Sequence, residues 1–365
     1  MRLIIHIGTP KAGSSSLQVA LSVNREVLAR NGILYPAIGR ATHHTDLAAG
    51  LHGADMMRDI DLRRNGGDPR AVEHRTEAAW QSVADQVRRH TPETVILSAE
   101  NFMSLDDFDT LRRWVGQIAP GAEVTSVAYL RSPVANHEAK ISQRLGRTSG
   151  VRLPGYLPWH ARLVRWRAVG QVHLRDLAAV GDLRVDFLET VQLGLSSIVT
   201  MPERNANVSL TGEGCIALHA VLSNAVKRDA ASFVEYTRDW RARLARAEAA
   251  LAGSVPLRHV SVTPAVRWLI LDAWHDEALA LRADFGFSFD EPELYDRGEI
   301  DRCLAETGAH ELELVESDLL SRFLSNDLEA AMQLLAHAAQ QSERRSDMVH
   351  SVKRALRKIL RRGGA

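Results

Sequence analysis

The order of elements at the start of the chain restricts the fold more than any other sequence feature. Residues 2–8 (RLIIHIG) are apolar or β-branched on both faces, which is typical of a strand buried in a parallel sheet. The loop TPKAGSSS follows at residues 9–16, and Leu17, Ala20 and Leu21 then recur at helical spacing. A strand, a loop and a helix in this order predict the first unit of an α/β fold.

Further short apolar runs, separated by amphipathic stretches, continue this pattern. The runs lie at residues 95–97, 124–130 and 172–174, and helical stretches are predicted at 71–89 and 108–118. We therefore expect an α/β fold with a P-loop-like, largely parallel sheet flanked by helices. In such sheets, functional groups gather at the carboxyl ends of the strands.

The second half of the chain has a different character. Residues 214–228, 231–252 and 262–283 are rich in Ala, Leu and Arg and favour helices, with few strand signals. No Gly/Ser/Pro-rich linker separates the two halves. The pattern predicts an α/β core over residues 1–210 and a helical subdomain over residues 211–343.

Residues 344–365 form a basic amphipathic tail. Its apolar positions share one helical face, and cationic side chains occupy most of the rest. Such a tail fits peripheral contact with an anionic membrane surface, and it equally fits a terminal helix that packs its apolar stripe on the body. The sequence leaves both interpretations open.

Composition excludes several classes of protein. The 45 Lys+Arg residues balance 45 Asp+Glu residues, which argues against a nucleic-acid partner bound by bulk electrostatics. Two cysteines, Cys215 and Cys303, cannot build a disulfide framework, and neither cysteines nor histidines show metal-ligand spacing, so we expect a reducing compartment and no metal. Without a signal-peptide pattern or an apolar run long enough for a membrane span, the expected location is the cytoplasm.

The loop after the first strand resembles a nucleotide-binding loop without matching its usual form. Gly8 and Gly13 have the spacing of the pattern G-x-x-x-x-G-K-[ST], but Ser14 stands where that pattern has lysine. Lys11 lies three residues earlier, and the apolar run at 124–130 ends in an arginine instead of a carboxylate. The residues that would hold a magnesium triphosphate are therefore incomplete.

The same loop still predicts an anion site. Backbone N–H groups at residues 13–16 would lie at a helix amino terminus, where the helix dipole favours negative charge. Lys11 would neutralise charge on a bridging or leaving oxygen during group transfer. The plainer alternative is a serine-capped helix with a surface lysine.

At these residues the chain resembles the sulfotransferases that use 3'-phosphoadenosine 5'-phosphosulfate (PAPS), and more closely their bacterial carbohydrate- or lipid-modifying branch. The family loop has the form T-x-P-K-[ST]-G-[ST]-[ST]; here Thr and Pro are adjacent, and Ala12 replaces a hydroxyl residue. The resemblance implies that Lys11 is the catalytic lysine at the bridging oxygen. It also implies that the 5'-phosphate and the sulfuryl group are bound by Gly13, Ser14, Ser15 and Ser16.

A second family element binds the 3'-phosphate of PAPS. It consists of a strand that ends in arginine, followed eight residues later by a serine, and Arg131 in YLRSP matches the arginine. The eighth residue after it is Ala139, so the serine is missing. Ser142, or Lys140 and Arg144, would have to replace it. Taken alone, Arg131 could also be a surface ion-pair partner.

Sulfuryl transfer also needs a base that accepts the acceptor's proton. Glu100, in the segment SAEN, directly follows a predicted strand, and the family places its base at a comparable strand end. His43 and His44 form a second candidate pair in a polar loop, because histidine titrates near neutral pH. We favour Glu100, although an ion-pair role for Glu100 and a loop or acceptor-binding role for the histidines remain open.

Together these features predict a cytoplasmic PAPS-dependent sulfotransferase. Its acceptor would be a hydroxyl or amine of a glycan, a glycolipid or another small molecule. Two other functions fit parts of the pattern: a P-loop kinase that acts on a small molecule, and a non-catalytic nucleotide-binding scaffold.

Overall fold

A computed structural model of the chain describes residues 1–9, 11–52, 57–146, 158–195, 199–200, 210–223, 230–307 and 324–340. The chain forms two compact units. The first contains Met1–Ser132, Leu157–Arg204 and Asp276–Glu291, and the second contains Pro133–Tyr156, Asn205–His275 and Pro292–Ala365.

The first unit is built on a five-stranded sheet in which every strand pair is parallel. The strand order is β2-β3-β1-β4-β5. The strands are β1 (Arg2–Ile7), β2 (Ile33–Leu34), β3 (Thr94–Ala99), β4 (Glu123–Leu130) and β5 (Gln171–Asp176). The predicted α/β fold with a parallel sheet is therefore confirmed, and β2 is a short strand that the apolar pattern did not indicate.

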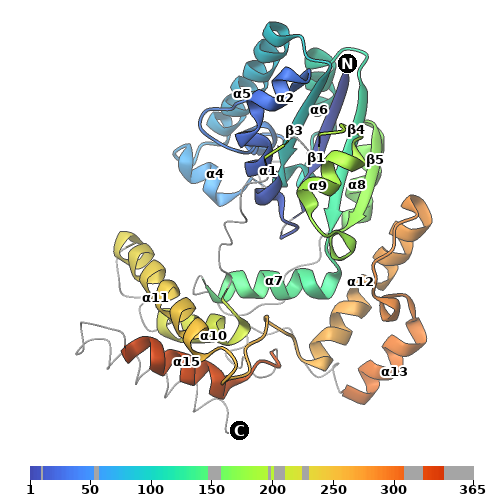
Figure 1. Ribbon diagram of the computed structural model, residues 1–365. Helices are drawn as coiled ribbons and strands as arrows, with labels where there is room; N and C mark the ends of the chain where they lie inside the picture. The colour runs from blue at the N-terminus through green and yellow to red at the C-terminus, as the bar shows by residue number, and fades with distance from the viewer. Residues whose placement is uncertain are drawn as a thin grey trace. The chain divides into compact units, whose positions relative to one another are not determined.

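Helices flank this sheet (Figure 1). Leu3, Ile4 and Ile5 of β1 are all fully buried, which requires cover on both faces of the sheet because successive side chains point to opposite faces. The α-helices are α1 (Ser14–Val23), α2 (Arg25–Arg30), α3 (Asp46–Ala49), α4 (Asp59–Arg64), α5 (Pro69–His90), α6 (Phe108–Ile118), α8 (Trp159–Arg167) and α9 (Leu183–Thr190). Two 3₁₀ turns, η2 (Glu100–Ser104) and η3 (Leu177–Ala179), follow β3 and β5.

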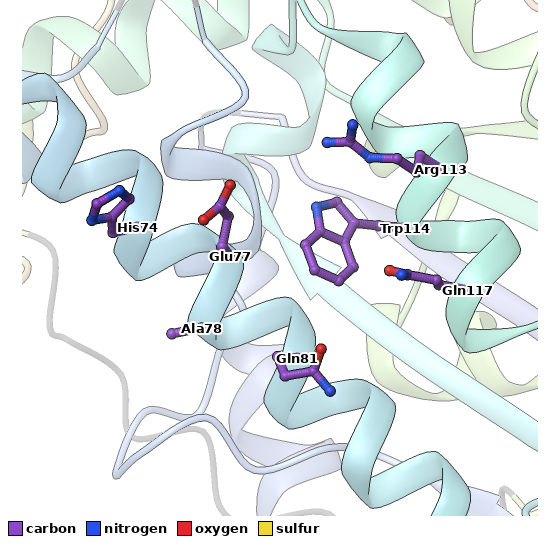
Figure 2. A pocket seen from close by; sticks show the side chains of 7 residues that line it. All are labelled: His74, Glu77, Ala78, Gln81, Arg113, Trp114 and Gln117. Carbon is purple, nitrogen blue, oxygen red and sulfur yellow. The ribbon is translucent and has the colours of Figure 1, made fainter.

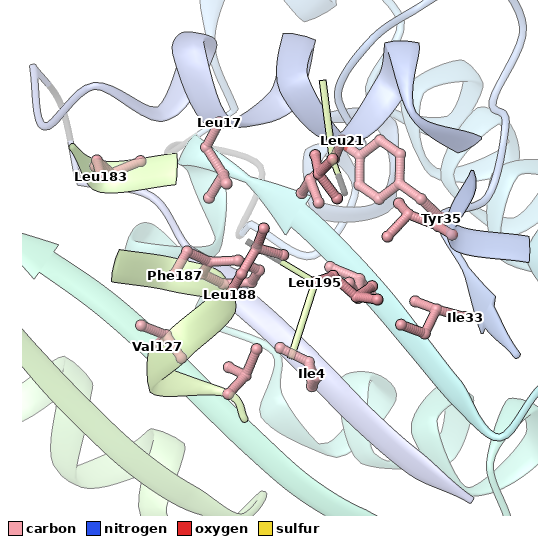
Figure 3. Packing of buried hydrophobic residues seen from close by; sticks show 14 of the residues in the cluster. Ile4, Leu17, Leu21, Ile33, Tyr35, Val127, Leu183, Phe187, Leu188 and Leu195 are labelled. Atoms are coloured by element: carbon pink, nitrogen blue, oxygen red, sulfur yellow. The ribbon is translucent and has the colours of Figure 1, made fainter. Parts of the chain in front are cut away.

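One apolar cluster joins α1 and α9 to the sheet. Leu17 and Leu21 of α1 and Phe187 of α9 pack over Ile4 and Val127 of the central strands (Figure 3). Full burial of each such side chain contributes roughly 1.5–3 kcal/mol. The cluster therefore fixes α1, and the loop that precedes it, on the sheet.

The strand order creates a topological switch point beside β1. After β1 the chain crosses toward β2 and β3, whereas after β4 it continues in the opposite direction to β5. In open α/β sheets, ligands bind where connections leave neighbouring strands in opposite directions. The loop after β1 and the segment after β4 flank this position.

The described elements of the second unit are helices and short turns. They are α7 (Pro133–Leu145), α10 (Gly212–Leu222), α11 (Ala230–Leu251), η4 (Pro292–Tyr295), α13 (Arg297–Thr307), α15 (Leu328–Gln340) and the first part of α12 (Pro264–Phe285). Helices α10, α11 and α15 pack against one another. None of the helices with described coordinates is long and apolar enough to cross a membrane.

The unit boundaries differ from the ranges predicted by composition. Residues 133–145 form a helix of the second unit, and residues 276–291 return to the first. Such exchanges depend on long-range packing, which leaves no local signal in composition. The predicted tail at residues 344–365 lies outside the described residues.

Candidate active site

The loop after β1 is held by both neighbouring strands. The Gly8 N–H donates to the Ala99 carbonyl at the end of β3 (3.0 Å), and the Thr9 hydroxyl donates to the Tyr129 carbonyl near the end of β4 (2.5 Å). The Thr9 side chain is fully buried. These bonds fix the start of the loop at the switch point, at the carboxyl end of the sheet.

Gly8 is required because the chain after β3 passes too close for a side chain. A Cβ atom on Gly8 would lie 2.4 Å from the Glu100 Cα atom and 2.8 Å from the Ser14 Oγ atom. The Glu100 contact is with backbone, so a rotamer change cannot relieve it. This close approach brings the loop, the start of α1 and the predicted base together.

The middle of the loop has an unusual backbone conformation. Lys11 has φ of 67° and Gly13 has φ of 80°, so both occupy the left-handed region. This region suits glycine but costs a residue such as lysine on the order of 1 kcal/mol. Such strain is characteristic of functional sites, where the surrounding structure holds a residue in an unfavourable conformation.

The burial of Ala12 accounts for one difference between this loop and the sulfotransferase pattern that it resembles. Its side chain is buried in the same apolar cluster as Leu17 and Leu21 of α1. A hydroxyl at this position would need a buried hydrogen-bond partner, so a methyl group fits better.

Helix α1 begins without a side-chain cap. Its N-cap residue is Gly13, which has no side chain that could accept a hydrogen bond from the first turn. Helix α5, in contrast, is capped by the Asp68 side chain, which accepts from the Arg70 N–H. The Ser16 N–H donates to the Gly13 carbonyl (3.0 Å), while Gly13, Ser14 and Ser15 have N–H groups with no partner in the described part of the chain. These N–H groups are available to an anion.

The serine hydroxyls at the start of α1 differ in their surroundings. Ser14 is only 5% exposed, and its Oγ atom has no hydrogen-bond partner among the described residues. Ser15 and Ser16 are exposed. Because a buried hydroxyl without a partner is destabilising, the Ser14 hydroxyl favours a bound group that would complete its hydrogen bonding.

Glu100 opens η2 directly after β3 and lies within the electrostatic reach of Lys11. Its side chain is exposed, but the protein packed around the carboxyl group raises its pKa above the usual value for glutamate. The positive charges of Lys11, Arg58 and His43 oppose this increase. The structure therefore brings the predicted base and the predicted catalytic lysine together.

Arg58 and Asn101 complete the surroundings of Glu100 and were not expected from sequence. The Arg58 side chain donates from Nε to the Asp61 carboxylate (2.7 Å) and from Nη1 to the Asn101 Oδ1 atom (2.9 Å). Asn101 is 6% exposed, and its Nδ2 atom has no partner among residues with described coordinates. Asn101 had a weak signal as the neighbour of Glu100, whereas Arg58 is one of many arginines.

Arg131 follows β4 at the other side of the switch point. It is partly buried, and this burial lowers the pKa of its guanidinium group. No carboxylate in the described part of the chain forms an ion pair with it, which does not support the surface ion-pair interpretation. A partly buried cation without a counter-ion favours an anionic ligand.

The residues considered as replacements for the family serine lie in the second unit, on α7. The Ser142 Oγ atom is 3.4 Å from the Cys215 Sγ atom of α10, and either atom can donate. Burial lowers the pKa of Lys140, and the positive charge of Arg144 lowers it further. Arg131 belongs to the first unit.

His44 is unsuited to act as a base. It is fully buried, its Nδ1 atom accepts a hydrogen bond from the Ser98 N–H (2.9 Å), and its Nε2 atom bonds to the Pro36 carbonyl (2.8 Å). Burial lowers its pKa to about 4. Both ring nitrogens therefore serve the backbone, and His44 has a structural role in place of the catalytic one considered from sequence.

His43 has a different environment from its neighbour. It is partly exposed, its Nδ1 atom accepts a weak hydrogen bond from the Thr45 N–H (3.4 Å), and its charge acts on Glu100. His43 therefore belongs to the candidate site as a neighbour of the base.

A separate groove of about 500 Å³ lies between α5 and α6. Figure 2 shows Glu77 and Gln81 of α5 facing Trp114 of α6 across it. None of its lining residues is among the site residues above. Within the described residues, no group of three or more His, Cys, Asp or Glu side chains could hold a metal ion.

Comparisons of the chain with protein-family models, with curated proteins and with solved structures found no match.

Replacing Gly8 by alanine should disrupt this site. The new methyl group would meet backbone at 2.4 Å, so we expect a loss of stability of roughly 2–4 kcal/mol or a displaced loop. Urea unfolding measures the first effect and loop amide chemical shifts the second. The control is Gly116→Ala in α6, where the space is open and alanine favours the helix. Equal behaviour of the two variants would contradict the close approach at Gly8.

Glu100→Gln should stabilise the protein in a pH-dependent way. A carboxyl group whose folded pKa is raised favours the neutral form, so its ionisation opposes folding at pH values above the folded pKa. We expect the variant to be more stable than the parent at pH 7, with the difference vanishing as the pH falls below the ordinary glutamate pKa. Urea unfolding between pH 3.5 and 8, beside the Glu123→Gln control at the exposed start of β4, measures this. A variant less stable than the parent at pH 7 would argue against the raised pKa.

Proposed function

We propose that the protein is a sulfotransferase that moves a sulfuryl group from PAPS to a hydroxyl or amine of a glycan, a glycolipid or another small acceptor. One observation carries the proposal. The uncapped start of α1, with the buried Ser14 hydroxyl, lies beside both a strained lysine and a glutamate of raised pKa. This transfer requires a group of hydrogen-bond donors that binds the anion, here the start of α1, together with a compact cation and a base.

Lys11 would stabilise the leaving group. In the transfer, the acceptor oxygen forms a bond to sulfur while the bond between sulfur and the bridging oxygen breaks. Negative charge then grows on the bridging oxygen, which leaves as part of adenosine 3',5'-bisphosphate. Lys11, held in the left-handed conformation within the loop, would neutralise this charge, and the N–H groups at the start of α1 would bind the 5'-phosphate.

Glu100 would take the proton that the acceptor loses. A base works best when its pKa lies near the working pH, and the pKa of Glu100 is raised toward that range. Its position at the carboxyl end of β3, within reach of the Lys11 charge, supports this role. The positive charge of Arg58 opposes the rise of the Glu100 pKa and so favours the ionised form that can accept the proton.

Arg131 would bind the 3'-phosphate that distinguishes PAPS from ATP. Its partial burial without an ion-pair partner among the described residues supports this assignment. The assignment of PAPS therefore relies on the loop and on Arg131.

The P-loop kinase has less support from the same residues. A magnesium triphosphate site needs a lysine at the helix start in addition to a carboxylate that holds the metal, and Glu100 is the carboxylate beside this loop. Here β4 is followed by Arg131, and Ser14 occupies the helix start. A non-catalytic scaffold would explain an anion cradle but would not need a base beside it.

Replacing Lys11 by alanine tests the proposal directly. With ³⁵S-labelled PAPS and a lipid and glycan extract from cells that lack the gene, the parent should label an acceptor. Lys11→Ala should lower the rate about 100-fold or more while thermal unfolding remains unchanged. Arg30→Ala, which removes an exposed cation from α2, serves as the control and should keep its activity. Undiminished transfer by Lys11→Ala would overturn the catalytic role, and no transfer by the parent would favour the scaffold.

A further inference from the structure

Ser98 lies inside the sheet, directly beneath the candidate active site. It is fully buried in β3, two residues before Glu100, and it stands beside His6 in the parallel register of β3 and β1. Both residues share the face that carries Ile4 and Ile96, because side chains two residues apart on a strand point the same way. This is the face on which α1 packs.

The Ser98 side chain connects β3 to β1 and to α1. The His6 Nδ1 atom lies 2.8 Å from the Ser98 Oγ atom, and the Gln18 Nε2 atom donates to the same Oγ atom at 3.2 Å. Gln18 lies on α1, one turn after Ser14, and is 5% exposed. The Ser98 hydroxyl therefore links β3, the strand that precedes Glu100, to α1, the helix whose start is the candidate anion site.

The Ser98 backbone connects β3 to the segment that carries His43. The Ser98 N–H donates to the His44 Nδ1 atom (2.9 Å), and the His44 N–H donates to the Ser98 carbonyl (2.8 Å). The Gln18 Nε2 atom also reaches this carbonyl, at 3.5 Å. His44 in turn bonds to the Pro36 carbonyl and packs on the Tyr35 ring, with 4.5 Å between ring centroids.

The hydroxyl, the N–H and the carbonyl of Ser98 all take part in hydrogen bonds to other segments. A buried polar cluster that joins several segments holds them in one arrangement, because each broken bond leaves a buried group unsatisfied. A well-packed apolar residue at position 98 would keep the backbone bonds to His44 but would lose the hydroxyl bonds to His6 and Gln18, and with them the polar link between β1, β3 and α1. Filling the core does not require these hydrogen bonds, so they point to a role for Ser98 in positioning the segments.

We propose that Ser98 is a positioning residue whose hydroxyl holds the start of α1 and Glu100 in one fixed arrangement, while its backbone holds the His43–His44 segment beside them. Its catalytic meaning rests on the proposed function, since it would set the distance between the donor site and the base. The geometric proposal holds for any anion that the start of α1 binds.

The chain offers a matched control on the neighbouring strand. Ser126 of β4 is also a fully buried serine within the sheet, but its Oγ atom has no hydrogen-bond partner among the described residues. Ser126→Ala and Ser98→Ala therefore remove the same atom from similar depths. Only Ser98→Ala breaks hydrogen bonds between segments, namely those to His6 and Gln18.

Hydrogen exchange of the full chain without ligand tests the geometric proposal. In Ser98→Ala, amides of α1 and of η2 should exchange about tenfold faster, because the lost bonds ease local opening of both segments together. In Ser126→Ala the same amides should keep their parental rates. Gln18→Met, which keeps the side-chain volume, should reproduce the Ser98→Ala effect and covers the case in which that variant fails to fold. Equal rates in all variants, or faster exchange confined to β3, would overturn the proposal.

A binding measurement separates this inference from the proposed function. Calorimetry with inorganic pyrophosphate probes the start of α1 without any nucleotide, and NMR titration reports the pKa of Glu100. We expect Ser98→Ala to weaken pyrophosphate binding several-fold and to move the Glu100 titration, whereas Ser126→Ala changes neither. If only thermal stability changes, Ser98 has a structural role alone. Binding of pyrophosphate but not of the adenosine bisphosphate by the parent would count against the sulfotransferase and leave the positioning role standing.

Discussion

The close approach of Gly8 to the backbone at Glu100 is the constraint on which the candidate site depends. With only 2.4 Å between an added Cβ atom and the Glu100 Cα atom, the loop after β1 and the turn after β3 can meet only through a glycine. The bonds from Gly8 to Ala99 and from Thr9 to Tyr129 then fix the loop between two strands. The start of α1, Lys11 and Glu100 are positioned as a consequence.

The electrostatics of the site follow from this geometry. Protein packed around Glu100 raises its pKa, while Lys11, Arg58 and His43 limit the rise. Arg58 itself is held by Asp61, which is almost fully buried and also binds Arg75. A carboxyl group of raised pKa beside a lysine is the kind of perturbed titratable pair that marks a candidate functional site.

Sequence patterns predicted the local part of this arrangement. The apolar run at residues 2–8, the loop after it and the helix of Leu17 and Leu21 appear as expected, because strand and helix periodicity are local properties. Glu100 and Lys11 come together because parallel strands end at one edge of the sheet. Ala12 could be read as a departure from the motif but not as a core residue, since its burial depends on α9 packing over the loop.

Other parts of the site depend on contacts that no local pattern reveals. His44 looked like a base by residue type, but the strand it bonds to lies more than fifty residues away in the chain. Arg58 carries no signal of its own because its role comes from buried partners at Asp61 and Asn101. Nothing in the local sequence distinguishes Ser98 from other strand residues. Its partners come from β1, α1 and the loop before α3, which pack around it only in the folded chain.

The most direct test of the central claim is calorimetric titration of the purified chain with adenosine 3',5'-bisphosphate and, separately, with ATP and magnesium. We expect the chain to bind the bisphosphate, and we expect Arg131→Gln to weaken this binding at least tenfold through loss of a charge-assisted contact to the 3'-phosphate. ATP, which lacks that phosphate, should bind more weakly. Tight binding of ATP with magnesium, together with no affinity for the bisphosphate, would rule out the sulfotransferase and favour the kinase.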